Sequence, residues 1–159
     1  MSCSPGPAEL ERYLIQWICD LVGFPKGSGG DLTSGGSVAN LSAIVTAREV
    51  KKIRSREVEN TVVYLTEQAH YSISKGLHIA GLGDCIMRAV PIDQRFRMDV
   101  DALKEMVQQD VAAGLKPFLV VASAGTTEVG AVDPMKAIAG VAREYSLWFH
   151  VDAACMYLI

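Results

Sequence analysis

Apolar positions recur with helical spacing near the start of the chain. Leu10, Leu14, Trp17 and Leu21 follow one another every three or four residues until Gly23 interrupts the pattern. This spacing predicts an amphipathic helix that ends just before a glycine-rich loop.

Beyond that loop, short runs rich in β-branched and aromatic residues alternate with stretches of helical spacing. The pattern predicts helices from Ser37 onward and over residues 70–81, 100–113 and 134–145, and strands over residues 61–65, 85–90, 118–122 and 148–151. Strands joined by helical crossovers are typical of an α/β fold with a mainly parallel sheet flanked by helices and connected in the right-handed sense.

Composition narrows the class of protein. The chain has 159 residues, of which 50% are hydrophobic and 21% charged, as in a globular domain, and its longest apolar runs are too short to cross a bilayer. A net charge of −3 argues against nucleic acid as a partner, and we interpret the basic run over residues 51–56 as the solvated end of a helix. Four cysteines without a Cys-x-x-Cys pair favour reduced thiols and a cytoplasmic protein, and the short apolar runs favour the absence of a membrane partner.

Ligands of parallel α/β sheets collect beyond the carboxyl ends of the strands. Polar segments follow three predicted strands, at residues 67–70 and 123–127 and at Asp152, and a glycine-dense loop over residues 27–36 precedes the second helix. These four segments are the candidate functional elements.

The glycine-dense loop has the features of an anion site. Gly36 and Ser37 would present backbone N–H groups at a helix N-terminus, which favours a phosphate. The alternative is a flexible connection capped by a serine. Neither Gly-Lys-Ser/Thr nor a complete G-x-G-x-x-G occurs, which disfavours a nucleotide-binding protein.

His150 and Asp152 are two residues apart on a predicted strand, so their side chains can share one face. A buried carboxylate needs a partner, which could be a cationic ligand, an arginine or backbone N–H groups. Thr127, after a predicted strand, could orient a ligand or cap a turn. The three histidines form no recognisable metal-binding set.

Four segments in order resemble one family. TSGGSVANLSA, EQAHYS, SAGTTEVGAVD and WFHVDAA together resemble the pyridoxal-phosphate-dependent amino-acid decarboxylases of the aromatic-L-amino-acid and glutamate type. The resemblance implies part of the large domain of an aspartate-aminotransferase-like (PLP-transferase) fold. We therefore expect residues 1–159 to be an incomplete large domain, with a leading helix in residues 1–22 and a cofactor-binding α/β core in residues 23–159.

The resemblance implies pyridoxal 5'-phosphate as cofactor and assigns roles by position. The Gly36–Ser37 pair is similar to the phosphate-binding segment, and His70 resembles the histidine that stacks on the pyridine ring. Thr127 is similar to a threonine that contacts the cofactor near its ring, Asp152 to the carboxylate that pairs with the pyridine nitrogen, and Ala154 to the small residue on the other ring face. His70 and Asp152 are thus the candidate catalytic residues.

The implied activity is decarboxylation of an L-amino acid by a homodimer of the full-length protein. Aromatic amino acids, glutamate, aspartate and sulfinates are all open as substrates, and overall similarity favours an aromatic amino acid. Family members carry a Schiff-base lysine downstream of HVDAA, and none of the lysines of this chain matches it. We therefore expect the isolated chain to be inactive. The alternative is a degenerate fragment that binds the cofactor or joins a heteromer without catalysis. Asp133 is expected to support the loop that contains it.

Overall fold

The computed structural model describes residues 5–155, and the chain divides into two compact units, residues 1–35 and 36–159. In the first unit, α1 spans Pro5–Leu21 and confirms the amphipathic helix predicted from the apolar spacing. Proline suits the first position of a helix because its missing N–H would have no partner there. The loop that follows is held to this helix by the Leu32 N–H, which donates to Glu11 Oε1 at 3.1 Å.

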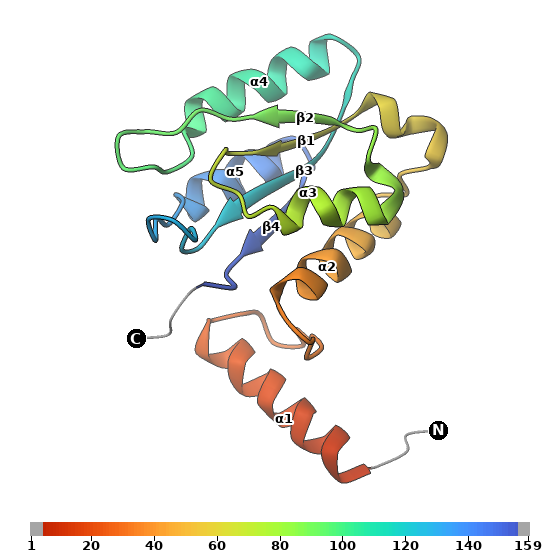
Figure 1. Ribbon diagram of the computed structural model, residues 1–159, viewed down its shortest axis with the longest axis vertical. Coiled ribbons are helices and arrows are strands. Elements are labelled where there is room, and N and C mark those ends of the chain that lie inside the picture. The colour runs from red at the N-terminus through yellow and green to blue at the C-terminus, as the bar shows by residue number, and fades with distance from the viewer. Residues whose placement is uncertain (1–4, 156–159) are drawn as a thin grey trace. The chain divides into compact units, whose positions relative to one another are not determined.

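The second unit is built on a four-stranded parallel sheet (Figure 1). Its spatial order is β2-β1-β3-β4, and every neighbouring pair is parallel. The strands are β1 (Thr61–Leu65), β2 (Ile86–Ala89), β3 (Lys116–Ser123) and β4 (Trp148–Asp152). The predicted α/β class with a parallel sheet is therefore confirmed.

Helices cover both faces of this sheet (Figure 1). They are α2 (Gly36–Val50), α3 (Ser72–Leu77), α4 (Val100–Ala112) and α5 (Met135–Glu144), with a short 3₁₀ helix η1 (Ser55–Asn60) and a single π-type turn η2 (His78–Leu82). No helix in residues 5–155 is long and apolar enough to span a membrane.

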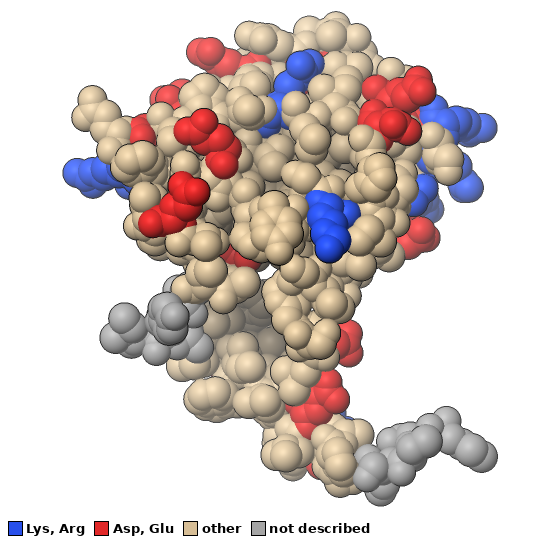
Figure 2. Space-filling view, in the orientation of Figure 1, with Lys and Arg blue, Asp and Glu red and all other residues tan. Residues whose placement is uncertain are grey.

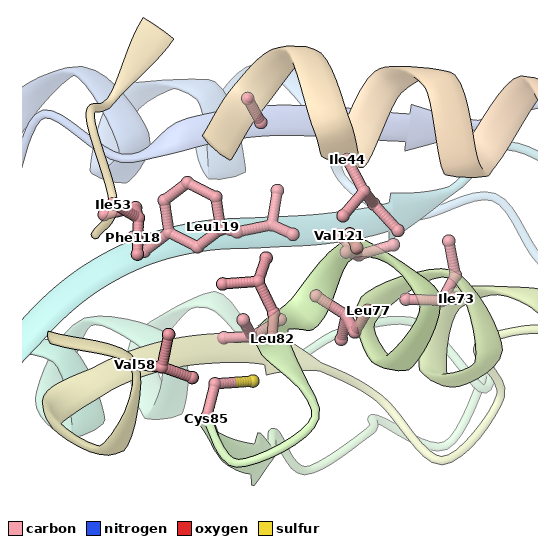
Figure 3. Close-up of a cluster of buried hydrophobic side chains, with 13 residues drawn as sticks. Ile44, Ile53, Val58, Ile73, Leu77, Leu82, Cys85, Phe118, Leu119 and Val121 are labelled. Atoms are coloured by element: carbon pink, nitrogen blue, oxygen red, sulfur yellow. The ribbon is translucent and has the colours of Figure 1, made fainter. Parts of the chain in front are cut away.

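Each face of the sheet has its own hydrophobic core, because side chains alternate between the faces of a strand. On the α2 and α3 side, Ile44, Ile73 and Leu77 pack over Leu119 and Val121 of β3 (Figure 3). On the opposite face, the intervening residues of the same strands pack against α4 and α5. The two central strands are buried on both sides and form a rigid base for the loops at their ends.

Two sequence-based expectations differ from the structure in detail. The helix predicted over residues 70–81 is found as α3 followed directly by η2, and Gly81, at φ +70°, is the non-helical residue within it. The Arg48 guanidinium donates to the Ala80 carbonyl and would lie 2.9 Å from a Cβ at Gly81. The basic run over residues 51–56 only begins at the end of α2, where the Lys51 N–H donates to the Ala47 carbonyl at 2.9 Å, and its last residues belong to η1. Elsewhere, acidic and basic side chains are interspersed on the face shown in Figure 2.

Candidate active site

A cavity of about 190 Å³ lies at the carboxyl ends of β1, β3 and β4, beside the first turn of α2. All six residues that the resemblance assigned to the cofactor line it, although they come from four separate segments, whereas His150 and Asp133 do not line it. The full lining is Gly36, Ser37, Asn40, Gln68, His70, Ser72, Ser123, Gly125, Thr126, Thr127, Asp152, Ala154 and Cys155. The cavity therefore lies where the carboxyl-end rule for parallel sheets predicts a ligand site.

The first turn of α2 approaches the loop after β4 very closely. A Cβ built on Gly36 would lie 2.9 Å from the Cβ of Ala154, a separation that real side chains do not adopt. Glycine is therefore required at this position for steric reasons. The backbone N–H groups of the first helical turn have no partners within the helix, so they give this end of the cavity a positive character.

Asp152 ends β4 with both carboxylate oxygens hydrogen-bonded. Oδ2 accepts from Asn40 Nδ2 at 2.9 Å, and Oδ1 accepts from the Ala154 backbone N–H at 3.1 Å. None of the ion pairs within residues 5–155 includes this carboxylate. Of the partners left open by the sequence, an arginine is therefore excluded among these residues, and a backbone N–H is present. Each oxygen retains a lone pair for a further donor.

Asn40 joins this carboxylate to two histidines. Its Oδ1 lies 2.9 Å from His150 Nε2, and its Nδ2 lies 2.9 Å from Ser72 Oγ. Ser72 Oγ in turn lies 2.7 Å from His70 Nδ1. Asn40 and Ser72 are almost fully buried, at 4% and 2% exposure, so their polar atoms depend on one another for hydrogen bonding.

Burial lowers the pKa of His150, and the negative charge of Asp152 only partly opposes this effect. The imidazole is therefore neutral at neutral pH and donates from Nε2 to the Asn40 oxygen. As the sequence suggested, His150 and Asp152 share one face of β4, because both side chains contact the same amide.

Asn40 and Ser72 are the site residues that the sequence did not reveal. Asn40 shares the buried face of α2 with Ile44 and Ala47, so an amide stands in phase with apolar core positions. A polar residue on an otherwise apolar helical stripe was the available signal. Ser72 begins α3 and offers no comparable pattern.

The two threonines after β3 have different surroundings. Thr126 is buried, and its Oγ1 accepts from the Ala131 N–H at 3.0 Å, which makes it a turn-capping residue. The Thr127 hydroxyl lies at the cavity, 3.7 Å from Cys155 Sγ. Asp133 supports this loop, as expected, because its carboxylate accepts at 2.7 Å from the N–H groups of Met98 and Ser123.

One buried acceptor at the cavity lacks a hydrogen-bond partner. Gln68 Oε1 is enclosed and has no donor within residues 5–155. Leaving such an atom unpaired costs free energy, so a cavity with this feature is suited to a ligand that carries a donor. No lysine in the described part of the chain lines the cavity.

Comparisons with known proteins identify the family of the chain. Residues 1–156 match the family described as "Pyridoxal-dependent decarboxylase conserved domain". The aromatic-L-amino-acid decarboxylase of Bacillus atrophaeus is 36% identical over 149 residues, which cover 94% of this chain and 31% of that protein. L-2,4-diaminobutyrate decarboxylase of Acinetobacter baumannii is 34% identical over 169 residues, with coverages of 95% and 33%.

Solved structures give the same result. The crystal structure of Oryza sativa TDC with PLP and tryptamine matches with a TM-score of 0.85 and 32% identity, over 94% of this chain and 34% of that chain. The chain therefore belongs to the pyridoxal-dependent decarboxylase family, whose cofactor is pyridoxal phosphate. It spans about a third of the length of these relatives.

Proposed function

We propose that the residues lining this cavity form part of the cofactor site of an enzyme that removes carbon dioxide from an L-amino acid. The observation that carries this proposal is the carboxylate of Asp152, which is held by hydrogen bonds at the cavity and carries no ion-pair partner within residues 5–155. When bound, pyridoxal phosphate supplies a protonated pyridine ring that accepts the electron pair left on the α-carbon when carbon dioxide departs.

The residues of the cavity suit this cofactor. The first turn of α2 at Gly36 and Ser37 would bind the phosphate through its N–H groups, because a helix N-terminus attracts an anion. Asp152 would accept a hydrogen bond from the pyridine nitrogen and keep that nitrogen protonated. The unpartnered Gln68 Oε1 is one further acceptor for a donor group on the ligand.

Three further side chains would hold the ring. His70 would stack on one face and help orient the carboxylate of the substrate, and Ala154 would leave space on the other face because its side chain is small. Thr127, whose hydroxyl lies at the cavity, would contact the cofactor near its ring. His70 and Asp152 are the proposed catalytic residues.

The test is a titration of the purified chain with pyridoxal phosphate. We expect Asp152→Asn, which keeps the shape of the side chain and removes its charge, to raise the Kd at least about tenfold, since a charged hydrogen bond contributes about 1.5–3 kcal/mol. Asp84→Asn is the matched control, because Asp84 is exposed and does not line the cavity. Equal affinity of the Asp152→Asn variant and the unmodified chain would contradict the proposed role.

We propose an aromatic L-amino acid as the substrate. The support is the similarity to the aromatic-L-amino-acid decarboxylase of Bacillus atrophaeus. The diaminobutyrate decarboxylase of Acinetobacter baumannii is nearly as similar, so the experiment must compare both substrates. The protein that contains these residues should show a higher kcat/KM with an aromatic amino acid than with 2,4-diaminobutyrate, and the reverse order would refute this assignment.

For these 159 residues alone we propose cofactor binding without decarboxylation. The supporting observation is that no lysine of the described residues lines the cavity, so covalent attachment of the cofactor has no candidate there. The purified chain should therefore bind pyridoxal phosphate reversibly, and dialysis should remove the cofactor from it. Carbon dioxide release from any amino acid well above the rate with free cofactor would refute this proposal.

We further propose a cytoplasmic homodimer for the full-length protein. Cys19, Cys85 and Cys155 are free thiols, as is usual in a reducing compartment. Light scattering during gel filtration would measure the assembly, and a monomer at micromolar concentration would contradict the dimer.

A further inference from the structure

Asn40 occupies a special place in the second unit. It lies one helical turn after Gly36 on α2 and is buried between the end of β4 and the start of α3. Its one side chain makes three hydrogen bonds, to Asp152, Ser72 and His150. The two proposed catalytic residues are thus connected through a single amide and one hydroxyl.

The directions of these hydrogen bonds follow from the chemistry of the groups. An ionised carboxylate only accepts, so Asp152 must receive one N–H of the Asn40 amide. The amide oxygen then faces His150, which must donate from Nε2. The second amide N–H donates to Ser72 Oγ, so this hydroxyl must accept a hydrogen bond from Asn40.

The Ser72 hydroxyl connects Asn40 to His70. Its hydroxyl accepts from Asn40 and keeps its own hydrogen, which it can donate to His70 Nδ1 at 2.7 Å. The backbone N–H of Ser72 also donates to Nδ1, at 3.3 Å. Because the backbone N–H of Ser72 can only donate, Nδ1 presents a lone pair and is unprotonated in the neutral ring, so the Ser72 hydroxyl also donates to it and the proton of His70 resides on Nε2.

We propose that Asn40 is a positioning residue that fixes the carboxylate plane of Asp152 and, through Ser72, the Nε2–H form of His70. This inference rests on the proposed function for its meaning in catalysis, although the hydrogen-bond network itself does not require the cofactor. The orientation has two effects: the Asp152 oxygens cannot rotate away from the cavity, and Nε2–H is the group that His70 offers to a ligand. The Asn40 side chain on α2 thereby fixes both the orientation of the Asp152 carboxylate and the tautomer of His70.

The test is the tautomeric state of the histidines, measured by long-range ¹H–¹⁵N NMR correlations in the 159-residue chain without cofactor. The sequence contains three histidines, so each can be assigned by single substitution. We expect His70 and His150 to carry their protons on Nε2. A signal from His70 protonated on Nδ1 would overturn the proposal.

Asn40→Asp keeps the shape of the side chain and replaces the amide donors with an acceptor. The Ser72 hydroxyl should then turn toward the introduced carboxylate, and His70 should lose part of its Nε2–H population. His150 should keep its tautomer, because an oxygen still accepts from it. Ser72→Ala tests the same step without a new charge, and it should shift the His70 signals and leave those of His150 unchanged.

Gln108→Glu is the matched control, since it makes the same amide-to-acid change at an exposed position on α4. It should leave the signals of His70 and His150 unchanged. If His70 keeps its signals in both Asn40→Asp and Ser72→Ala, the proposal is wrong. Should Asn40→Asp fail to fold, the Ser72→Ala result decides.

Cofactor affinity separates this proposal from the proposed function. We expect Asn40→Asp to raise the Kd for pyridoxal phosphate at least about tenfold, because it removes a charge-assisted hydrogen bond from Asp152 and adds a like charge beside it. If the tautomers respond as described but the unmodified chain binds no pyridoxal phosphate, the proposed function fails and the network stands. If the unmodified chain binds but Asn40→Asp binds equally well, the positioning role fails.

Discussion

Replacing Gly36 with alanine tests the geometry of the cavity directly. The new Cβ would lie 2.9 Å from the Cβ of Ala154, whereas two carbon atoms attract best at about 3.5–4.0 Å. Either the first turn of α2 or the loop after β4 must therefore move by several tenths of an ångström. Both segments line the cavity, so the movement changes the site itself.

The expected magnitude follows from the cost of overpacking. Such strain costs about 1–3 kcal/mol, which corresponds to an increase of about 5- to 150-fold in Kd if relief of the strain displaces the first turn of α2, the proposed phosphate-binding segment. The assay is titration of the chain with pyridoxal phosphate, with circular dichroism to verify the fold. Gly140→Ala is the control, because a Cβ on that glycine of α5 meets nothing within 4 Å.

A second substitution identifies the contact responsible. Ala154→Gly removes the atom that the new Cβ would strike, so the double variant Gly36→Ala/Ala154→Gly should bind more tightly than Gly36→Ala alone. A double-mutant cycle separates this coupling from any loss caused by Ala154→Gly itself. The steric explanation is refuted if Gly36→Ala binds like the unmodified chain, or if the two substitutions are simply additive.

Three other properties can be measured independently. Tyr64 donates to the buried Asp110 at 2.8 Å, so Tyr64→Phe should lower the free energy of unfolding by about 1 kcal/mol. Asp110→Ala should lower it by roughly 2–3 kcal/mol, because it also leaves Arg88 without its carboxylate partner. Equal effects of the two substitutions in denaturant titrations would contradict this ranking. Burial lowers the pKa of His150, so stability present above the unfolded pKa of about 6.5 should be lost as the pH falls through the lower folded pKa; melting curves of His150→Gln should lack this loss. Cys155 is exposed at the cavity, so pyridoxal phosphate should slow its alkylation, and peptide mapping that shows no protection would argue against binding there.

Local patterns in the sequence predict most elements of the fold. The strand at residues 61–65 is found where its β-branched run lies, because the residues of β1 are buried between two helical layers. The break after α3 was not predictable from residues 70–81 alone. The non-helical residue is Gly81 within η2, which adopts a left-handed conformation and lacks the Cβ that would strike Arg48 of α2, a residue far away in the sequence.

The candidate site shows the same difference between features set by local sequence and features set by distant contacts. The places of Asp152 and Gly36 at the cavity could be predicted because each occupies a position with a general meaning, the end of a parallel strand and the start of a helix. The place of Asn40 could not, since its hydrogen bonds reach groups 32 and 110 or more residues away along the chain. Local sequence patterns indicate long-range hydrogen bonds only weakly. The one indication here is a single amide, Asn40, on the buried face of α2.

These long-range contacts all involve α2, which explains how one helix can determine the geometry of the cavity. Asn40 fixes its first turns to β4 and α3. At its middle, Ile44 packs so closely on Gly76 of α3 that a Cβ there would lie 2.9 Å from Ile44 Cδ1. Near its end, Arg48 donates to the carbonyls of Ile53 and Ala80. A helix held at three levels cannot slide or rotate without breaking buried contacts, so the glycine and the amide at its N-terminal end keep their positions relative to Asp152.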